Sequence, residues 1–302
     1  MEIKDRVVVV TGGASGIGRS LCLAFAGAGA QAVVAADLDT AGATAVAAEV
    51  EALGAGGLGV RCDVSVERDV QDLVRAAEER FGPVDVFCAN AGILALGGIE
   101  APDEVWDRAW AINVKSHLYA ARAVVPGMVE RGEGYLVHTA SAAGLLTQLG
   151  AAPYSVSKHA VVSFAEWLSI TYGDAGVHVS CLCPQGVATN LGETSRAVLS
   201  GREPHSSPAA RPAATATAVD VVGEGLGERE SGGVHQAARD GIVSPDAVAQ
   251  LVLDAVREER FLILPHPEVE TYERRRTGDR ERWLNGMRRA QAQMVAAFRS
   301  QQ

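Results

Sequence analysis

The chain has 302 residues, of which 48% are hydrophobic and 21% charged, and its formal net charge is −10. This is enough apolar material for one large core, which excludes a small disulfide-stabilised scaffold and a wholly disordered chain. A general nucleic-acid binder needs an excess of Lys and Arg, so we expect no nucleic-acid partner for this acidic chain.

The five cysteines each lie in an apolar stretch, and no two of them form a CxxC pair. This pattern is typical of buried free thiols in a reducing compartment, and no Cys/His cluster has the spacing of zinc ligands. A charged N-terminus leads directly into the apolar run 7–10, which is unlike a signal peptide. The uncharged stretch 21–36 contains glycines and is short for a membrane span. We therefore expect a cytoplasmic protein with no bound metal and no membrane association.

Short apolar runs alternate with longer segments of helical pattern along most of the chain. The runs are β-branched or continuously apolar, as strands covered on both faces are. They span 6–10, 32–36, 58–62, 84–88, 134–139, 178–183 and 261–264. The helical segments between them span 16–28, 41–53, 66–81, 104–130, 154–175 and 245–257. The alternation predicts an α/β fold, a doubly wound parallel sheet (Rossmann fold), in a single domain over residues 1–302.

Two segments depart from this alternation. Residues 190–243 are rich in Ala, Gly, Pro and Ser, which leaves a substrate lid and a disordered surface insertion as alternatives. We favour a lid whose middle part, about 200–218, is poorly ordered. Residues 268–302 are dense in Arg and Glu, which predicts a charged, solvated amphipathic helix that could dock on a partner subunit.

The first predicted strand leads into a glycine-rich turn, Thr11-Gly12-Gly13-Ala14-Ser15-Gly16-Ile17-Gly18, and a helix follows at once. Glycine lets the backbone turn tightly and approach a pyrophosphate, and the N-terminus of the helix offers N–H groups to the phosphates. Because a strand precedes the turn and a helix follows it, we interpret it as a dinucleotide site and not as an ordinary turn.

Asp37 ends the second predicted strand, about 20 residues after the glycines. A carboxylate here accepts hydrogen bonds from the adenosine ribose hydroxyls and repels a 2′-phosphate. Neither Leu38 nor Ser15 supplies a cation to attract such a phosphate. We therefore predict NAD as the cofactor, in preference to NADP; the alternative is that Asp37 is a plain turn residue.

Tyr154 and Lys158 are four residues apart in a predicted helix, a spacing that places both on one face. An ammonium near a phenol favours phenolate, so we expect Lys158 to lower the pKa of Tyr154 and allow proton exchange with an alcohol. Ser141 closes the fifth strand and could hold the reacting oxygen, or it is a loop hydroxyl. Asparagine is unfavourable inside a helix, so we expect that Asn113 either has a function or occupies a bend of the helix.

With these residues in this order, the chain resembles the short-chain dehydrogenase/reductase family, of the compact single-domain type. Further matching pieces are Cys62-Asp63-Val64, Asn90-Ala91-Gly92 and Pro184-Gln185-Gly186-Val187-Ala188-Thr189. The resemblance covers about residues 4–189 and resumes over about 244–265. It implies a catalytic group with Tyr154 as the acid/base and Ser141 orienting the substrate oxygen. It also implies that Lys158 binds the nicotinamide ribose and that Asn113 holds a water linking Lys158 to solvent.

The resemblance extends to the cofactor and substrate sites. Cofactor contacts are expected from Gly12, Ser15, Gly16, Ile17, Gly18, Asp37, Asp63, Val64, Asn90, Ala91, Gly92, Tyr154, Lys158, Pro184, Val187 and Thr189. Apolar side chains that flank the predicted cleft suggest a hydrophobic substrate pocket that includes Ser141, Tyr154, Ile93, Leu94, Leu145 and Leu191. Gln185 stands where the family usually has a smaller or apolar residue, and it either reaches the substrate or only packs.

We predict an NAD-dependent alcohol dehydrogenase or ketoreductase that acts on CH–OH groups and interconverts a hydrophobic secondary alcohol and its ketone by hydride transfer. One alternative is a regulatory protein that senses NAD(H) without chemistry, which the complete catalytic group disfavours. The other is a nucleotide-sugar epimerase or dehydratase, whose relatives carry a larger C-terminal substrate domain. The partners we expect are a small-molecule substrate and, as is common in the family, further copies in a homodimer or homotetramer.

Overall fold

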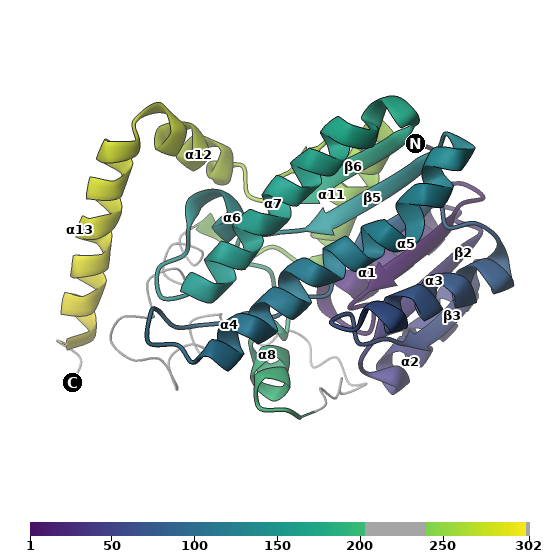
Figure 1. Ribbon diagram of the computed structural model, residues 1–302, viewed down its shortest axis with the longest axis horizontal. Helices are drawn as coiled ribbons and strands as arrows, with labels where there is room; N and C mark the ends of the chain where they lie inside the picture. The colour runs from purple at the N-terminus through teal and green to yellow at the C-terminus, as the bar shows by residue number, and fades with distance from the viewer. Residues whose placement is uncertain (203–239, 300–302) are drawn as a thin grey trace.

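A computed structural model describes residues 1–202 and 240–299 of the chain. Seven strands form one sheet in the order β3-β2-β1-β4-β5-β6-β7 (Figure 1). The strands are β1 Val7–Thr11, β2 Ala32–Asp37, β3 Gly56–Arg61, β4 Val86–Ala89, β5 Gly134–Thr139, β6 Val177–Leu182 and β7 Leu262–Ile263. All neighbouring strands are parallel, which confirms the predicted doubly wound sheet. The strand order reverses between β1 and β4, and ligands of such sheets bind at the carboxyl ends of the strands there.

Helices cover both faces of the sheet (Figure 1). They are α1 Gly16–Gly27, α2 Thr40–Ala52, α3 Glu67–Phe81, α4 Asp103–Trp110, η1 Ala111–Lys115, α5 Ser116–Arg131, α6 Ala142–Leu146, α7 Ala152–Tyr172, η2 Gly173–Ala175, α8 Leu191–Leu199, α11 Pro245–Glu258, α12 Glu268–Gly278 and α13 Arg280–Arg299. Alternate residues of each strand point to opposite faces. Val9 therefore belongs to the core under α3, α5 and α7, whereas Val8 and Val10 belong to the core under α1, α2 and α11.

The C-terminal part differs from the single helix that the sequence predicted over 268–302. Two helices are present, α12 and α13, because Asp279 breaks the helical backbone and its carboxylate accepts the backbone N–H of Arg282 at 2.9 Å. Such a side chain begins a new helix. Helix α12 packs on α6, while α13 extends away from the sheet (Figure 1).

The predicted lid begins with a helix, α8, which the sequence analysis did not anticipate. Most of the segment expected to be poorly ordered, 203–218, lies outside the described residues. Within residues 1–202 and 240–299, no helix is both long and apolar enough to cross a membrane. The same residues contain no group of three or more His, Cys, Asp or Glu side chains arranged to hold a metal ion.

Candidate active site

The turn between β1 and α1 forms a cradle from which side chains are excluded. Gly12 and Gly16 have φ angles of +66° and +51°, in the region that favours glycine. A Cβ atom on Gly18 would lie 1.9 Å from the carbonyl oxygen of Gly12. Ser15 stands at the N-cap of α1 without a side-chain capping bond, and the first turn contains no acidic residue. The cradle therefore fits the pyrophosphate of a dinucleotide, held by backbone N–H groups at a helix N-terminus.

Asp37 lies beside this cradle at the end of β2. Its carboxylate accepts the backbone N–H of Ala14 at 3.1 Å and that of Asp39 at 3.1 Å. Burial raises the pKa of Asp37, while these N–H groups oppose the shift. The carboxylate is thus tied to the glycine turn, at the position expected for a ribose acceptor.

A hydrogen-bond network joins the ends of β1, β4 and β5. Thr11 Oγ1 accepts the backbone N–H groups of Asn90 (3.0 Å) and Ala91 (3.2 Å). The Asn90 side chain donates to the Thr11 carbonyl at 3.0 Å and accepts from Thr139 Oγ1 at 3.2 Å. The Thr139 carbonyl in turn accepts Lys158 Nζ at 2.9 Å. No sequence motif pointed to Thr139, whose only signal was its place at the end of a central strand.

Asn113 lies in η1, a π-helical turn that interrupts the continuous helix predicted over 104–130. The buried side chain accepts the N–H of Ile93 at 2.8 Å and donates to the Ile93 carbonyl at 2.9 Å and to Ser157 Oγ at 3.1 Å. A Cβ atom on Gly92 would lie 3.3 Å from both Asn113 Oδ1 and Lys158 Nζ. Asn113 therefore belongs beside Lys158, at a π turn of the kind that is frequent in functional sites.

Ser141 and Tyr154 face each other at the carboxyl end of β5. Ser141 Oγ accepts the N–H of Ala143 at 3.1 Å, which caps α6, and donates to the Pro184 carbonyl at 3.4 Å. A hydrogen bond with Ser141 lowers the pKa of the Tyr154 phenol, but burial has the larger effect and raises it. The structure thus brings these two predicted residues together.

The prediction that Lys158 lowers the pKa of Tyr154 is wrong, because burial, and not Lys158, has the largest effect on the pKa of this phenol. Lys158 Nζ lies 5.7 Å from the centre of the Tyr154 ring and is hydrogen-bonded to the Thr139 carbonyl. Both side chains are buried, and burial disfavours the charged form of each. It raises the pKa of Tyr154 and lowers the pKa of Lys158 to about 8. The spacing of the two residues indicated their proximity but not this loss of solvent.

Asp63, Val64 and Thr189, three more of the predicted cofactor residues, lie in the turns after β3 and β6. Asp63 Oδ1 accepts the N–H and hydroxyl of Ser65 at 2.9 and 2.6 Å, so this carboxylate orders the turn after β3, and Val64 is buried there. After β6, a Cβ atom on Gly16 would lie 3.1 Å from Thr189 Cγ2, which places Thr189 against the glycine turn.

Predicted substrate residues gather around Tyr154 only in part. Leu94 packs with the cluster that contains Tyr154, and its backbone N–H donates to Ser195 Oγ in α8 at 2.8 Å. Ile93 and Leu145 are buried in the large core, and Leu191 is exposed at the start of α8. The Gln185 side chain donates to Asp240 Oδ2 at 3.1 Å.

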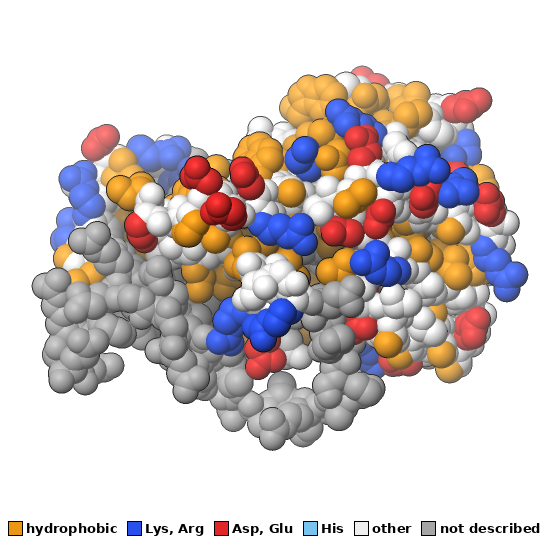
Figure 2. Space-filling model, turned by 60° about the horizontal axis from the view of Figure 1, so that its bottom comes forward, with side chains coloured by type: hydrophobic (Ala, Val, Ile, Leu, Met, Phe, Trp, Pro, Cys, Tyr) orange, Lys and Arg blue, Asp and Glu red, His pale blue; other side chains and the backbone are white. Residues whose placement is uncertain are grey.

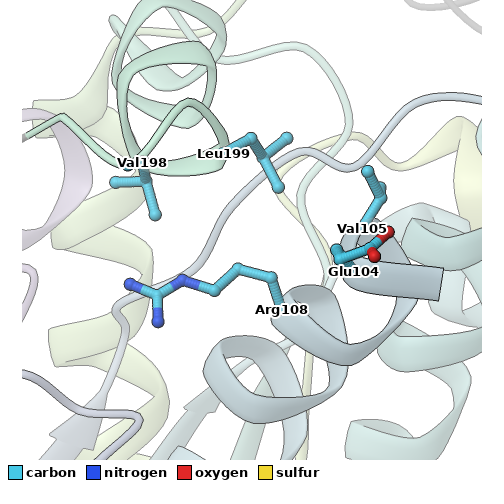
Figure 3. A pocket seen from close by; sticks show the side chains of 6 residues that line it. Glu104, Val105, Arg108, Val198 and Leu199 are labelled. Carbon is cyan, nitrogen blue, oxygen red and sulfur yellow. The ribbon is translucent and has the colours of Figure 1, made fainter. Parts of the chain in front are cut away.

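A cavity of about 350 Å³ opens between α4 and α8 (Figure 3). Its lining consists of Glu104, Val105, Arg108, Val198, Leu199 and Gly201, none of which the sequence analysis named. Arg108 extends below Val198, and the Glu104 carboxylate lies next to Val105 on the opposite side (Figure 3). Val198 is about one helical turn beyond Ser195, so α8 connects this cavity to the loop that carries Leu94.

The sequence of residues 6–199 matches the family model described as short chain dehydrogenase. The chain belongs to the short-chain dehydrogenase family. A 3beta-hydroxysteroid dehydrogenase 2 of Eggerthella lenta is 38% identical over 193 residues, covering 63% of this chain and 74% of the relative. A 1-deoxy-11-beta-hydroxypentalenate dehydrogenase of Streptomyces exfoliatus is 40% identical over 195 residues, covering 63% and 70%.

Solved structures extend the similarity over almost the whole chain. A short chain dehydrogenase/reductase from Burkholderia phymatum in complex with NAD has a TM-score of 0.78 and 32% sequence identity, and the match covers 93% of this chain and 96% of that one. The short-chain dehydrogenase family comprises oxidoreductases that bind NAD or NADP, which agrees with the cradle after β1. The resemblance predicted from the motifs is confirmed.

Proposed function

We propose that this short-chain dehydrogenase interconverts a hydrophobic secondary alcohol and its ketone, with NAD as the hydride acceptor or donor. The observation that carries the proposal is the burial of Tyr154, Ser141 and Lys158 together at the carboxyl ends of the strands, next to a cradle shaped for a dinucleotide. A protein that only senses NAD(H) would need the cradle but not the phenol, so this arrangement favours an enzyme.

The raised pKa of Tyr154 keeps the phenol protonated at neutral pH, which suits it to donate a proton to a ketone oxygen. In the oxidative direction the phenol first releases its own proton to solvent, and the phenolate oxygen then accepts the proton of the alcohol. Lys158, whose pKa burial lowers to about 8, can exchange a proton near neutral pH, and Asn113 lies beside it as the holder of a relay water. Ser141 donates a hydrogen bond to the reacting oxygen. The bound nicotinamide supplies or accepts the hydride.

The preference for NAD rests on Asp37. Its carboxylate is held beside the glycine turn by the N–H groups of Ala14 and Asp39, and a fixed negative charge there repels the 2′-phosphate of NADP. The relative from Burkholderia phymatum, whose structure contains NAD, supports the same choice.

Apolar side chains near the site support a hydrophobic substrate. Val105, Val198 and Leu199 line the α4/α8 cavity together with the charged Glu104 and Arg108, and Leu94 packs near Tyr154. The relatives named as hydroxysteroid and hydroxypentalenate dehydrogenases support this substrate class.

We also propose that the protein forms a homodimer or homotetramer. Large apolar side chains are exposed on α4 and α7, with Trp110 at 47%, Trp167 at 52% and Ile170 at 84% exposure. Figure 2 shows hydrophobic side chains exposed among charged ones along the upper edge of the molecule.

The five cysteines are free and buried, which supports a cytoplasmic setting.

The test compares Tyr154→Phe with Tyr172→Phe, which makes the same change at the far end of the same helix. NADH absorbance is followed with a panel of aliphatic, aromatic and steroid-like alcohols, and with the ketones plus NADH. Tyr154→Phe should lose at least about a hundredfold in rate and keep its affinity for NAD, because only the proton-transferring hydroxyl is removed. Tyr172→Phe should stay within about twofold of the wild type. Turnover of no compound by the wild type, or an unaffected rate in Tyr154→Phe, would contradict the proposal.

A further inference from the structure

We propose that His266 is a positioning residue for the nicotinamide end of the cofactor site. It lies between β7 and α12, outside residues 6–199 that match the family model, and it is only 2% exposed. The inference rests on the proposed function, because it assigns His266 to the support of the turn after β6.

Both ring nitrogens of His266 face backbone groups of other segments. The backbone N–H of Gln185 donates to Nδ1 at 3.2 Å, and Nε2 lies 3.3 Å from the carbonyl oxygen of Gly241. Because Nδ1 accepts a hydrogen bond, the ring proton is on Nε2 and points to that carbonyl. The imidazole therefore joins the turn after β6 to the segment that precedes α11.

The turn held by His266 carries two parts of the active site. On one side, the Pro184 carbonyl accepts the N–H of Ala142 at 2.8 Å and the hydroxyl of Ser141 at 3.4 Å. On the other side, the chain continues to Val187 and Thr189, two of the expected cofactor contacts, which this proposal assigns to the nicotinamide end. A shift at Gln185 moves both sides together.

A second contact explains the glutamine at this position. Gln185 Nε2 donates to Asp240 Oδ2 at 3.1 Å, and the hydroxyl of Tyr272 in α12 donates to Asp240 Oδ1 at 3.0 Å. A smaller or apolar residue in place of Gln185 could not reach this carboxylate. Gln185 thus presents its backbone N–H to His266 and its side-chain amide to Asp240, and both tie the active-site turn to the C-terminal segment.

Loss of the imidazole leaves the Gln185 N–H without its acceptor at a part-buried position. The turn then relaxes, and misplacement of reacting groups by about 1 Å can cost about a hundredfold in rate. The adenosine half of the cofactor should respond much less, because its expected acceptor, Asp37, is held by Ala14 and Asp39 and forms none of the described hydrogen bonds with His266.

The experiment measures dissociation constants for NAD and for ADP-ribose, which lacks the nicotinamide, by isothermal titration calorimetry. The variants are His266→Leu, His266→Asn and His266→Gln, with His178→Leu, a half-buried histidine near the start of β6, as the matched control. We expect His266→Leu to bind NAD about tenfold more weakly and ADP-ribose within about twofold of the wild type. His266→Asn should recover most of the NAD affinity, because its amide oxygen can replace Nδ1, whereas His266→Gln should not. His178→Leu should change neither constant.

Equal NAD affinity in His266→Leu and the wild type would overturn the inference, and so would an equal loss of NAD and ADP-ribose binding. If His266→Leu does not fold, the contrast between His266→Asn and His266→Gln decides the question in the same way, and equal NAD affinities of these two would overturn it. A wild type that binds neither ligand would contradict the proposed function instead, so the two failures are distinguishable.

Discussion

We predict that the buried Lys158 ammonium lowers the free energy of unfolding of the protein. Its ammonium is buried, donates to the Thr139 carbonyl at 2.9 Å and makes no ion pair with a carboxylate of the described residues. Burial lowers its pKa from 10.5 to about 8. At pH 7 the side chain is still charged in the folded protein, and the difference between the two pKa values corresponds to a cost of about 3 kcal/mol. Lys158→Met should remove this cost and abolish proton exchange.

The dependence on pH separates this cost from other effects of the substitution. Between pH 8 and 10.5 the unfolded chain keeps a proton on Lys158 that the folded protein releases, so the wild type gains stability as the pH rises. The lost hydrogen bond to Thr139 shifts the stability of Lys158→Met by an amount that does not depend on pH. The free energy of unfolding of Lys158→Met relative to that of the wild type should therefore fall by about 1 kcal/mol between pH 7 and pH 9.

Urea unfolding followed by circular dichroism at pH 7, 8 and 9 gives these free energies. Lys115→Met is the control, because Lys115 is exposed and lies over the Tyr119 ring. Its difference from the wild type should stay constant over the same range. A constant difference for Lys158→Met as well would refute the reasoning, since it would mean that the Lys158 ammonium is not held at a cost.

Three further perturbations test the cofactor site and the core. Asp37→Ser should raise the affinity for NADP relative to NAD about tenfold, because it removes a fixed negative charge; an unchanged ratio of dissociation constants would count against this role. Gly18→Ala should abolish NAD binding in calorimetry, since its Cβ would lie 1.9 Å from a carbonyl of the same turn, whereas Gly27→Ala, with nothing within 4 Å, should bind normally. Burial lowers the pKa of His138 to about 3, and its Nδ1 lies 2.8 Å from that of His117, so the folded protein binds fewer protons than the unfolded chain below pH 6.5. Wild-type stability should fall by about 2 kcal/mol from His138 alone between pH 7 and 5. The double variant His117→Leu/His138→Leu should lack that loss in urea unfolding.

The elements that depend on local pattern were predictable from the sequence. The glycine turn between β1 and α1 is an example, because the strand, the glycines and the helix are contiguous in the chain. β3 was less well placed, with 58–62 predicted and Gly56–Arg61 observed. Its glycines resemble a turn in sequence, but a Cβ atom on Gly57 would lie 2.2 Å from the Ala47 carbonyl in α2. That need for close packing is a tertiary property, which no local pattern reveals.

At the candidate site, too, the sequence pattern did not reveal the effects of contacts between distant segments. Asn113 stood out in the sequence as an unfavourable helix residue, yet its partners, Ile93 and Ser157, come from two other segments. The spacing of Tyr154 and Lys158 predicted that they are neighbours. The direction of their pKa shifts follows from burial by surrounding elements, which reversed the effect expected for Tyr154.

The C-terminal segment contacts the active-site turn but supplies none of the proposed catalytic groups. Every proposed catalytic group comes from residues 6–199, the part that matches the family model. The turn that places Ser141 is nevertheless bonded to His266 and Asp240, from a part of the chain beyond that match. Since hydrogen bonds of this kind act on the position of a backbone and not on its chemistry, changes in the C-terminal segment can adjust the geometry around the nicotinamide while Tyr154 and Lys158 stay unchanged.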